Sequence, residues 1–395
     1  MRIATLLAAT IAGAALPALA LADQPAAPAA SPSPVLYSAT PPPTPTPAPS
    51  PSASPAVQLH GVFSATEVFT SGVNATGSFD TPTGADIASR FNVSNAFAIL
   101  TKTQGTLQYA LQAGAYSIPV VGFAGNKTIA SNANTGLYGP VPLAYLEYVP
   151  SSTFNVSAGV LATLTGAEST FTYLDWNIQR GAVWNVENAV SRGVRANFTT
   201  GKLTVTAGAN DGFYSGSWVA AEGALNYVPD SNESLLFVSL VPNAKTPPNP
   251  TASVANKELF DLVYTRTLGK LQIAPYVLWA NSPAAPSLGY TSSENAFGAA
   301  LLAQMSFSSK WSTALRYETL HNSSIPGATS LNADLVGYGP GSGVNTLTLT
   351  PEWKNGPVFA RIDFSDAWPG YYTPGLTFGP STSQFRTVVE VGVQL

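Results

Sequence analysis

The chain has 395 residues and a formal net charge of −4, with 45% hydrophobic residues, only 10% charged residues and no cysteine. The lack of cysteine excludes a disulfide framework, a thiol nucleophile and thiolate metal sites. The mildly acidic balance argues against nucleic acid as a partner, and charge is scarce beside the roughly 25% usual in soluble domains.

The N-terminal part has the features of a secretory signal peptide. Arg2 is followed by an apolar stretch that ends in the small-residue cleavage pattern Ala-Leu-Ala at 20–22. The next residues are rich in Pro, Ala and Ser, a composition that cannot bury apolar surface and that predicts an extended linker. The sequence therefore predicts a signal peptide at 1–22, a periplasmic linker at 23–56 and one folded domain at 57–395.

From residue 57 onward, apolar and polar residues alternate with the period of a β-strand. Short turns marked by Gly, Pro, Asn, Asp or Ser are predicted at seven places: 102–105, 150–153, 199–202, 229–232, 267–270, 308–310 and 354–356. Longer connections are predicted at 70–88, 118–141, 162–189, 210–217, 241–256, 281–295, 321–343 and 366–383. Seven short and eight long connections predict about sixteen strands.

A strict alternation of short and long connections is typical of an outer-membrane β-barrel, which has short periplasmic turns and long extracellular loops. The predicted fold is therefore an all-β, transmembrane antiparallel β-barrel in the outer membrane of a Gram-negative bacterium. The last segment, FRTVVEVGVQL at 385–395, alternates to its final residue. An open edge would invite aggregation, so we expect this strand to pair with the first one, near 57–69, and to close the ring.

Lipid would then cover the apolar outer face of the ring. Aromatic residues near the short turns are expected to form a girdle at the membrane interface. These are Tyr148, Phe154, Tyr227, Tyr264, Phe307, Trp311, Trp353 and Phe359.

The alternation also sorts charged residues onto one face of the predicted strands. A charge that faces lipid at mid-membrane costs about 2–4 kcal/mol, so we expect this face to line a wet lumen. The predicted pore-lining residues are Arg195, Asp261, Arg316, Glu318, Arg361, Asp363, Arg386 and Glu390. An alternative remains open, in which these arginines and carboxylates only brace the barrel wall.

The longest connection, at 162–189, has a length that indicates either a function or disorder. Its apolar and aromatic content argues against disorder, so we expect it to fold into the lumen and narrow the pore. Four charged residues are candidates for the constriction: Glu168, Asp175, Arg180 and Glu187. Placed opposite wall arginines, they would set a transverse field that filters solutes by charge and size. The alternative is an outward loop that shapes only the surface.

Several segments resemble the OmpL-like family of β-barrel porins. They include GPVPLAYLEYVPSSTFNVSAGVLATLTGAE at 139–168, DWNIQRGAVWNVENAVSRGVRANF at 175–198 and the terminal strand. Within them, Gly193-Val194-Arg195 matches the family's Gly-Val-Arg strand well. The chain ends in Leu395, where bacterial barrels usually have Phe or Trp. The resemblance implies an outer-membrane channel and does not name a solute.

An enzyme receives little support from the sequence, because His60 and His321 are its only histidines and no G-x-S-x-G or H-E-x-x-H motif occurs. No motif predicts a cofactor or a metal. The sequence thus favours a porin that passes small hydrophilic solutes or ions by passive diffusion. Its expected partners are outer-membrane lipid and these solutes, together with a possible homo-oligomer. A surface-displayed or secreted β-sandwich adhesin on a Pro-rich stalk is the alternative.

Overall fold

The computed structural model describes residues 57–71, 89–122, 138–214, 220–242, 257–286, 289–330, 333–372 and 381–395, with side chains from 91 onward in the second range. The predicted signal peptide and linker lie outside these residues. Within the described ranges, no helix is long and apolar enough to cross a membrane.

The described residues form sixteen strands. They are β1 (Gln58–Thr70), β2 (Ser89–Lys102), β3 (Leu107–Tyr116), β4 (Leu143–Ser151), β5 (Phe154–Ala162), β6 (Val190–Thr200), β7 (Leu203–Asn210), β8 (Ala220–Asp230), β9 (Glu233–Pro242), β10 (Glu258–Leu268), β11 (Leu271–Ser282), β12 (Glu294–Ser306), β13 (Trp311–Asn322), β14 (Gly343–Asn355), β15 (Val358–Tyr371) and β16 (Gln384–Gln394). The predicted strand count is confirmed.

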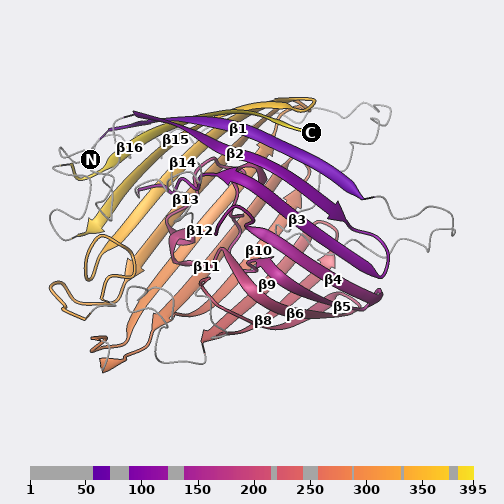
Figure 1. The fold of residues 1–395 in the computed structure, drawn as a ribbon. Coiled ribbons are helices and arrows are strands. Elements are labelled where there is room, and N and C mark those ends of the chain that lie inside the picture. The colour runs from indigo at the N-terminus through magenta and orange to yellow at the C-terminus, as the bar shows by residue number, and fades with distance from the viewer. Residues whose placement is uncertain are drawn as a thin grey trace. The chain divides into compact units, whose positions relative to one another are not determined.

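The strands form one closed antiparallel barrel in which each strand pairs with its neighbours in sequence (Figure 1). β16 pairs with β1 from Val62↔Gln394 to Thr70↔Arg386. The ring is sealed at the chain end by two backbone hydrogen bonds between Gly61 and Leu395, of 3.1 and 2.8 Å. The terminal strand therefore has no open edge, as the sequence predicted, and the β-sandwich alternative is wrong.

The connections alternate in length as expected, and each predicted short turn falls between two consecutive strands. Gly201, Gly269 and Gly356 have φ of 57–63° in three of these turns. A side chain is strained in this left-handed region, so glycine lets the strands reverse over two residues.

Side chains alternate between an exposed apolar outer face and a buried inner face. Tyr148, Tyr227 and Trp311 are exposed near the short turns, where the girdle was expected. Phe359 is an exception, and its predicted place in the girdle is wrong. It lies on the inward parity of β15 and is buried, with the Arg361 guanidinium 5.6 Å from its ring centre.

The inner face of the barrel has two contrasting parts. We call the first the polar wall; it spans β13 to β16 and continues over β1 and β2, and its buried inward residues include Ser64, Ser94, Arg316, Glu318, Thr346, Thr348, Thr350, Arg361, Asp363, Arg386 and Glu390. We call the second the apolar wall; it spans β9 to β12, and its buried residues include Leu236, Val238, Leu240, Leu259, Val263, Tyr276, Leu278, Ala296, Ala300 and Leu302.

Candidate constriction inside the barrel

The segment between β5 and β6, residues 163–189, lies against the inner wall of the barrel; we call it the inner loop (Figure 1). It contains two short 3-10 turns, η2 (Thr172–Leu174) and η3 (Val183–Val186). Ile178, Arg180 and Val183 are fully buried. A segment this buried must satisfy its backbone groups within the protein, because no water reaches them. The polar wall supplies many of these partners.

Two wall arginines hold the first half of the inner loop. Arg316 forms an ion pair with Glu168 of the loop and donates to the Gln179 carbonyl at 2.6 Å. Arg361 donates to the backbone carbonyls of Thr172 at 2.5 Å and Asp175 at 2.7 Å. A guanidinium carries five donors in a fixed fork, so each arginine joins the wall to two points of the loop.

Two wall carboxylates hold the middle of the inner loop by accepting from its backbone. Asp363 accepts from the N–H groups of Ile178 at 3.0 Å and Gln179 at 2.8 Å. Glu318 accepts from the N–H groups of Ala182 and Val183, at 3.0 and 3.1 Å. Hydrogen bonds to an ionised acceptor are roughly twice as strong as neutral ones, which favours a single position for this stretch.

The remaining charges of the polar wall complete this network. Glu390 accepts from the hydroxyls of Ser64 and Ser94, each at 2.8 Å, and from Arg361. Arg386 donates to the Val120 carbonyl at 3.0 Å, and Val120 in turn forms an isolated β-bridge with Arg180. The segment that follows β3 is therefore tied to both the wall and the inner loop.

Packing holds the other side of the inner loop. Val183 lies against Gly298 of β12, where a Cβ atom would come within 2.7 Å of the valine side chain. Phe171 makes edge-on ring contacts with Phe97 of β2 and Tyr116 of β3, at centroid distances of 5.1 and 5.4 Å. These contacts place the loop between opposite sides of the lumen.

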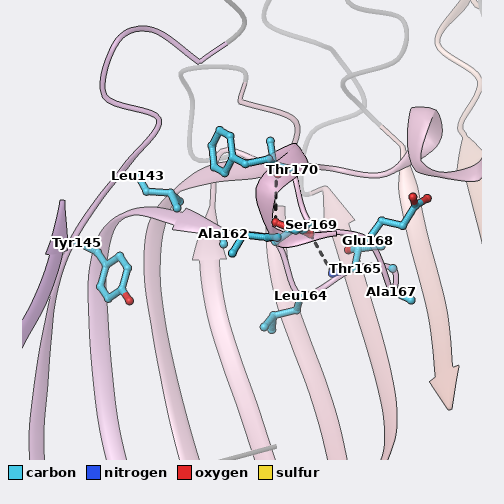
Figure 2. A pocket seen from close by; sticks show the side chains of 13 residues that line it. Leu143, Tyr145, Ala162, Leu164, Thr165, Ala167, Glu168, Ser169 and Thr170 are labelled. Atoms are coloured by element: carbon cyan, nitrogen blue, oxygen red, sulfur yellow. Dashed lines mark hydrogen bonds between the residues drawn. The ribbon is translucent and has the colours of Figure 1, made fainter. Parts of the chain in front are cut away.

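Two cavities border the inner loop. The smaller, of about 30 Å³, lies between the loop and β4 and β5, with room for a water molecule or two. Figure 2 shows Tyr145 and Leu164 beside it and the Glu168 carboxylate pointing away from them. The larger, of about 330 Å³, reaches the short turn at Asn232 and is lined by Asp175 and Trp176 of the loop. This volume lies within the range of small-molecule sites.

Comparison with known families decides the identity of the fold. Residues 57–395 match the family model described as "Putative beta-barrel porin-2, OmpL-like". The chain belongs to this porin family. It is therefore an outer-membrane β-barrel of a Gram-negative bacterium, with its short turns on the periplasmic side. No curated protein matches the chain.

Solved structures share the fold of this porin at low sequence identity. The outer-membrane channel DcaP of Acinetobacter baumannii has a TM-score of 0.55 and 10% identity, covering 86% of this chain and 97% of its own. In-vitro folded OmpT of Vibrio cholerae has a TM-score of 0.54 and 10% identity, with the same coverage. A trimer form of OmpT has a TM-score of 0.53 and 11% identity, covering 86% and 99%.

The structure places all eight predicted pore-lining residues of the porin on the inner face of the barrel, and all are buried. Their partners differ from the expectation of a field across an open gap, because Glu168 touches Arg316 directly. Arg195 does not face a loop carboxylate; it pairs with Glu222 of β8 at 2.9 and 3.0 Å and donates to the Ala162 carbonyl.

The four loop candidates divide into two kinds. Glu168, Asp175 and Arg180 take part in ion pairs, with Asp175 and Arg180 joined to each other. Glu187 is buried at the other end of the inner loop, and neither of its carboxylate oxygens accepts a hydrogen bond of normal geometry. Burial, and then the nearby Asp261 carboxylate, raise the pKa of Glu187 well above its usual range.

Sequence reasoning missed two charged residues that join this network. Glu222 could have been found from strand alternation, since it takes the inward parity of β8, shared with the buried Ala220 and Ala224. Lys257 precedes β10, and its ammonium donates to the Val186 carbonyl at 2.9 Å. No local pattern marks Lys257, because its position depends on where the inner loop returns to the wall.

Proposed function

We propose that this porin lets small hydrophilic solutes and ions cross the outer membrane by passive diffusion, through the part of the lumen that the inner loop leaves free. The attachment of the loop to the polar wall carries this proposal. A loop held by ion pairs and charged hydrogen bonds keeps one position, and an aperture bordered by it has a constant size. The 330 Å³ cavity beside Asp175 and Trp176 is large enough for small solutes.

The proposal is tested with refolded porin in planar bilayers and in liposomes. We expect discrete channel steps, and liposome swelling that declines with the size of the sugar offered. Shortening 164–188 with a Gly-Ser bridge should raise conductance and admit larger sugars, because it removes the narrowing element. Deleting residues 25–55 is the control and should change neither. The absence of any conductance in correctly folded porin would refute the proposal.

A passive channel fits this chain better than a catalyst. His60 lies near the periplasmic end of β1, and His321 lies near the extracellular end of β13. They cannot serve one site, and a hydrolase would need one of them beside an activated serine. Assays of the purified porin for ester and phospholipid hydrolysis should give no turnover above background. The His321→Ala variant is the matched comparison and should give the same result.

We also propose that the porin assembles as a homo-oligomer. The support is its likeness in fold to a trimer form of OmpT. Native mass spectrometry of detergent-extracted porin should give a multiple of the monomer mass. A monomer mass at every detergent concentration, for protein extracted directly from membranes, would contradict this assembly.

A further inference from the structure

Acidic side chains outnumber basic ones inside the described part of the barrel. We leave aside Asp211, which pairs with Arg192 at the extracellular end. Ten acidic and six basic side chains are then buried, an excess of four negative charges. The acidic residues are Glu147, Glu168, Asp175, Glu187, Glu222, Asp261, Glu294, Glu318, Asp363 and Glu390. The basic residues are Arg180, Arg195, Lys257, Arg316, Arg361 and Arg386.

The arginines are already occupied by partners of the protein. Each of the five donates to at least three acceptors or ion-pair partners. Arg361, for example, binds Glu390 and two carbonyls of the inner loop. A guanidinium engaged in this way has few donors left for a passing anion.

Glu187 and Asp261 take part in none of these arginine contacts, and both lie at Gly166 of the inner loop. Asp261 Oδ2 accepts from the Gly166 N–H at 2.6 Å, while its Oδ1 has no partner. Glu187 occupies the space where a Gly166 side chain would be, with Oε2 2.1 Å from an ideal Cβ position. Gly166 has φ of 77°, so glycine is required there for two reasons.

The surroundings of these carboxylates offer one basic group and one hydroxyl. Lys257 lies near Glu187, but its ammonium donates to the Val186 carbonyl and sits 4.7 Å from the Phe213 ring centre. Tyr276 is buried on the apolar wall beside Glu187, and its hydroxyl makes no hydrogen bond of normal geometry. Two carboxylates next to a single lysine leave one negative charge uncompensated, and such a charge is expensive to bury unless a cation balances it.

We propose that the channel conducts cations in preference to anions, with Glu187 and Asp261 as the main source of the negative field that a permeating cation meets. This inference rests on the proposed channel function. The arginines hold the loop through direct contacts, whereas Glu187 and Asp261 are buried with no arginine partner and act on a permeating ion through their field. A field focused by low-dielectric walls raises the local concentration of counter-ions.

The test is the reversal potential of refolded porin in a tenfold KCl gradient at mildly alkaline pH. We expect K⁺ to be at least about threefold more permeant than Cl⁻. The double variant Glu187→Gln with Asp261→Asn should lose most of this preference. Glu258→Gln removes one carboxylate from the outward side of β10, the strand that carries Asp261, and it should leave selectivity unchanged. A difference in gel migration between unheated and boiled samples shows that each variant is folded.

The outcomes separate this inference from the proposed function. Normal conductance with equal permeability, or with Cl⁻ preferred, overturns the cation preference and leaves the channel intact. A cation-selective wild type whose double variant keeps full selectivity overturns the assignment to Glu187 and Asp261. If the double variant does not fold, the wild-type reversal potential still decides the preference itself. Folded porin without any conductance refutes the channel.

Discussion

The polar wall and the apolar wall hold the same inner loop by different physical means. On the polar wall, Arg316, Arg361 and Asp363 reach the loop through charged hydrogen bonds that fix distance and direction. On the apolar wall, residues such as Gly298 only leave room for loop side chains. Hydrophobic contact is non-directional and roughly proportional to the area buried, so it supplies free energy without fixing position. The comparison indicates that the polar wall sets the position of the loop.

The largest expected effect comes from replacing Arg316 of the polar wall. Arg316→Met leaves Glu168 and Glu318 buried without their shared guanidinium, and breaking such a buried pair costs about 3–5 kcal/mol. We expect the loop to detach, with higher conductance and a lower urea midpoint in detergent.

Arg266→Met is the matched control for Arg316→Met. Arg266 pairs with Glu233 near the periplasmic end of β10, where both side chains are partly exposed, and an exposed pair contributes less than about 1 kcal/mol. If both variants shifted the urea midpoint equally, the polar wall would not have the role assigned to it.

A smaller effect is expected from the apolar wall at Gly298. Gly298→Ala places a methyl group within 2.7 Å of Val183, and overpacking of this kind costs about 1–3 kcal/mol. Val183→Ala in the same chain should restore part of the stability, which a double-mutant cycle measures. Gly370→Ala meets no atom within 4 Å and serves as the control. Additive effects of Gly298→Ala and Val183→Ala would show that the two sites are not in contact.

The smallest expected effect is a pH dependence at Glu187, near the end of the inner loop and beside the apolar wall. Burial holds the pKa of Glu187 above its unfolded value. The stability gained from its neutral form is therefore complete below the unfolded pKa and is lost as pH rises through the folded pKa. Asp261, Glu168 and Glu318 face Glu187 and favour the neutral form further, while the Tyr276 hydroxyl and Lys257 oppose them.

Burial also lowers the pKa of Lys257 to about 7, so this opposing charge fades as pH passes through neutrality. We expect the urea midpoint to fall as pH is raised above 4.5, the ordinary pKa of a glutamate, and cation preference to rise as Glu187 ionises. Glu187→Gln should flatten both profiles. A wild-type profile that already matches that of Glu187→Gln would show that Glu187 does not titrate in this range.

The sequence by itself determined the barrel of this porin. Strand alternation and turn residues are local signals, since side chains two residues apart share a face and glycine permits a tight reversal. These local signals predict the sixteen strands and the closure of the last strand on the first. They also predict the inward parity of residues such as Arg316 and Asp363. Phe359 differs from the expected girdle because its parity on β15 points it inward, although it lies close to a short turn.

Only the tertiary structure decided the partners inside the lumen. Arg195 pairs with Glu222, Arg316 with Glu168, and Lys257 with a loop carbonyl, and none of these follows from spacing along the chain. The path of the inner loop sets them, and that path results from many long-range contacts acting together. A charge inside a closed barrel must be balanced by a group that the fold brings beside it. That group is distant along the chain, so the local sequence does not predict it.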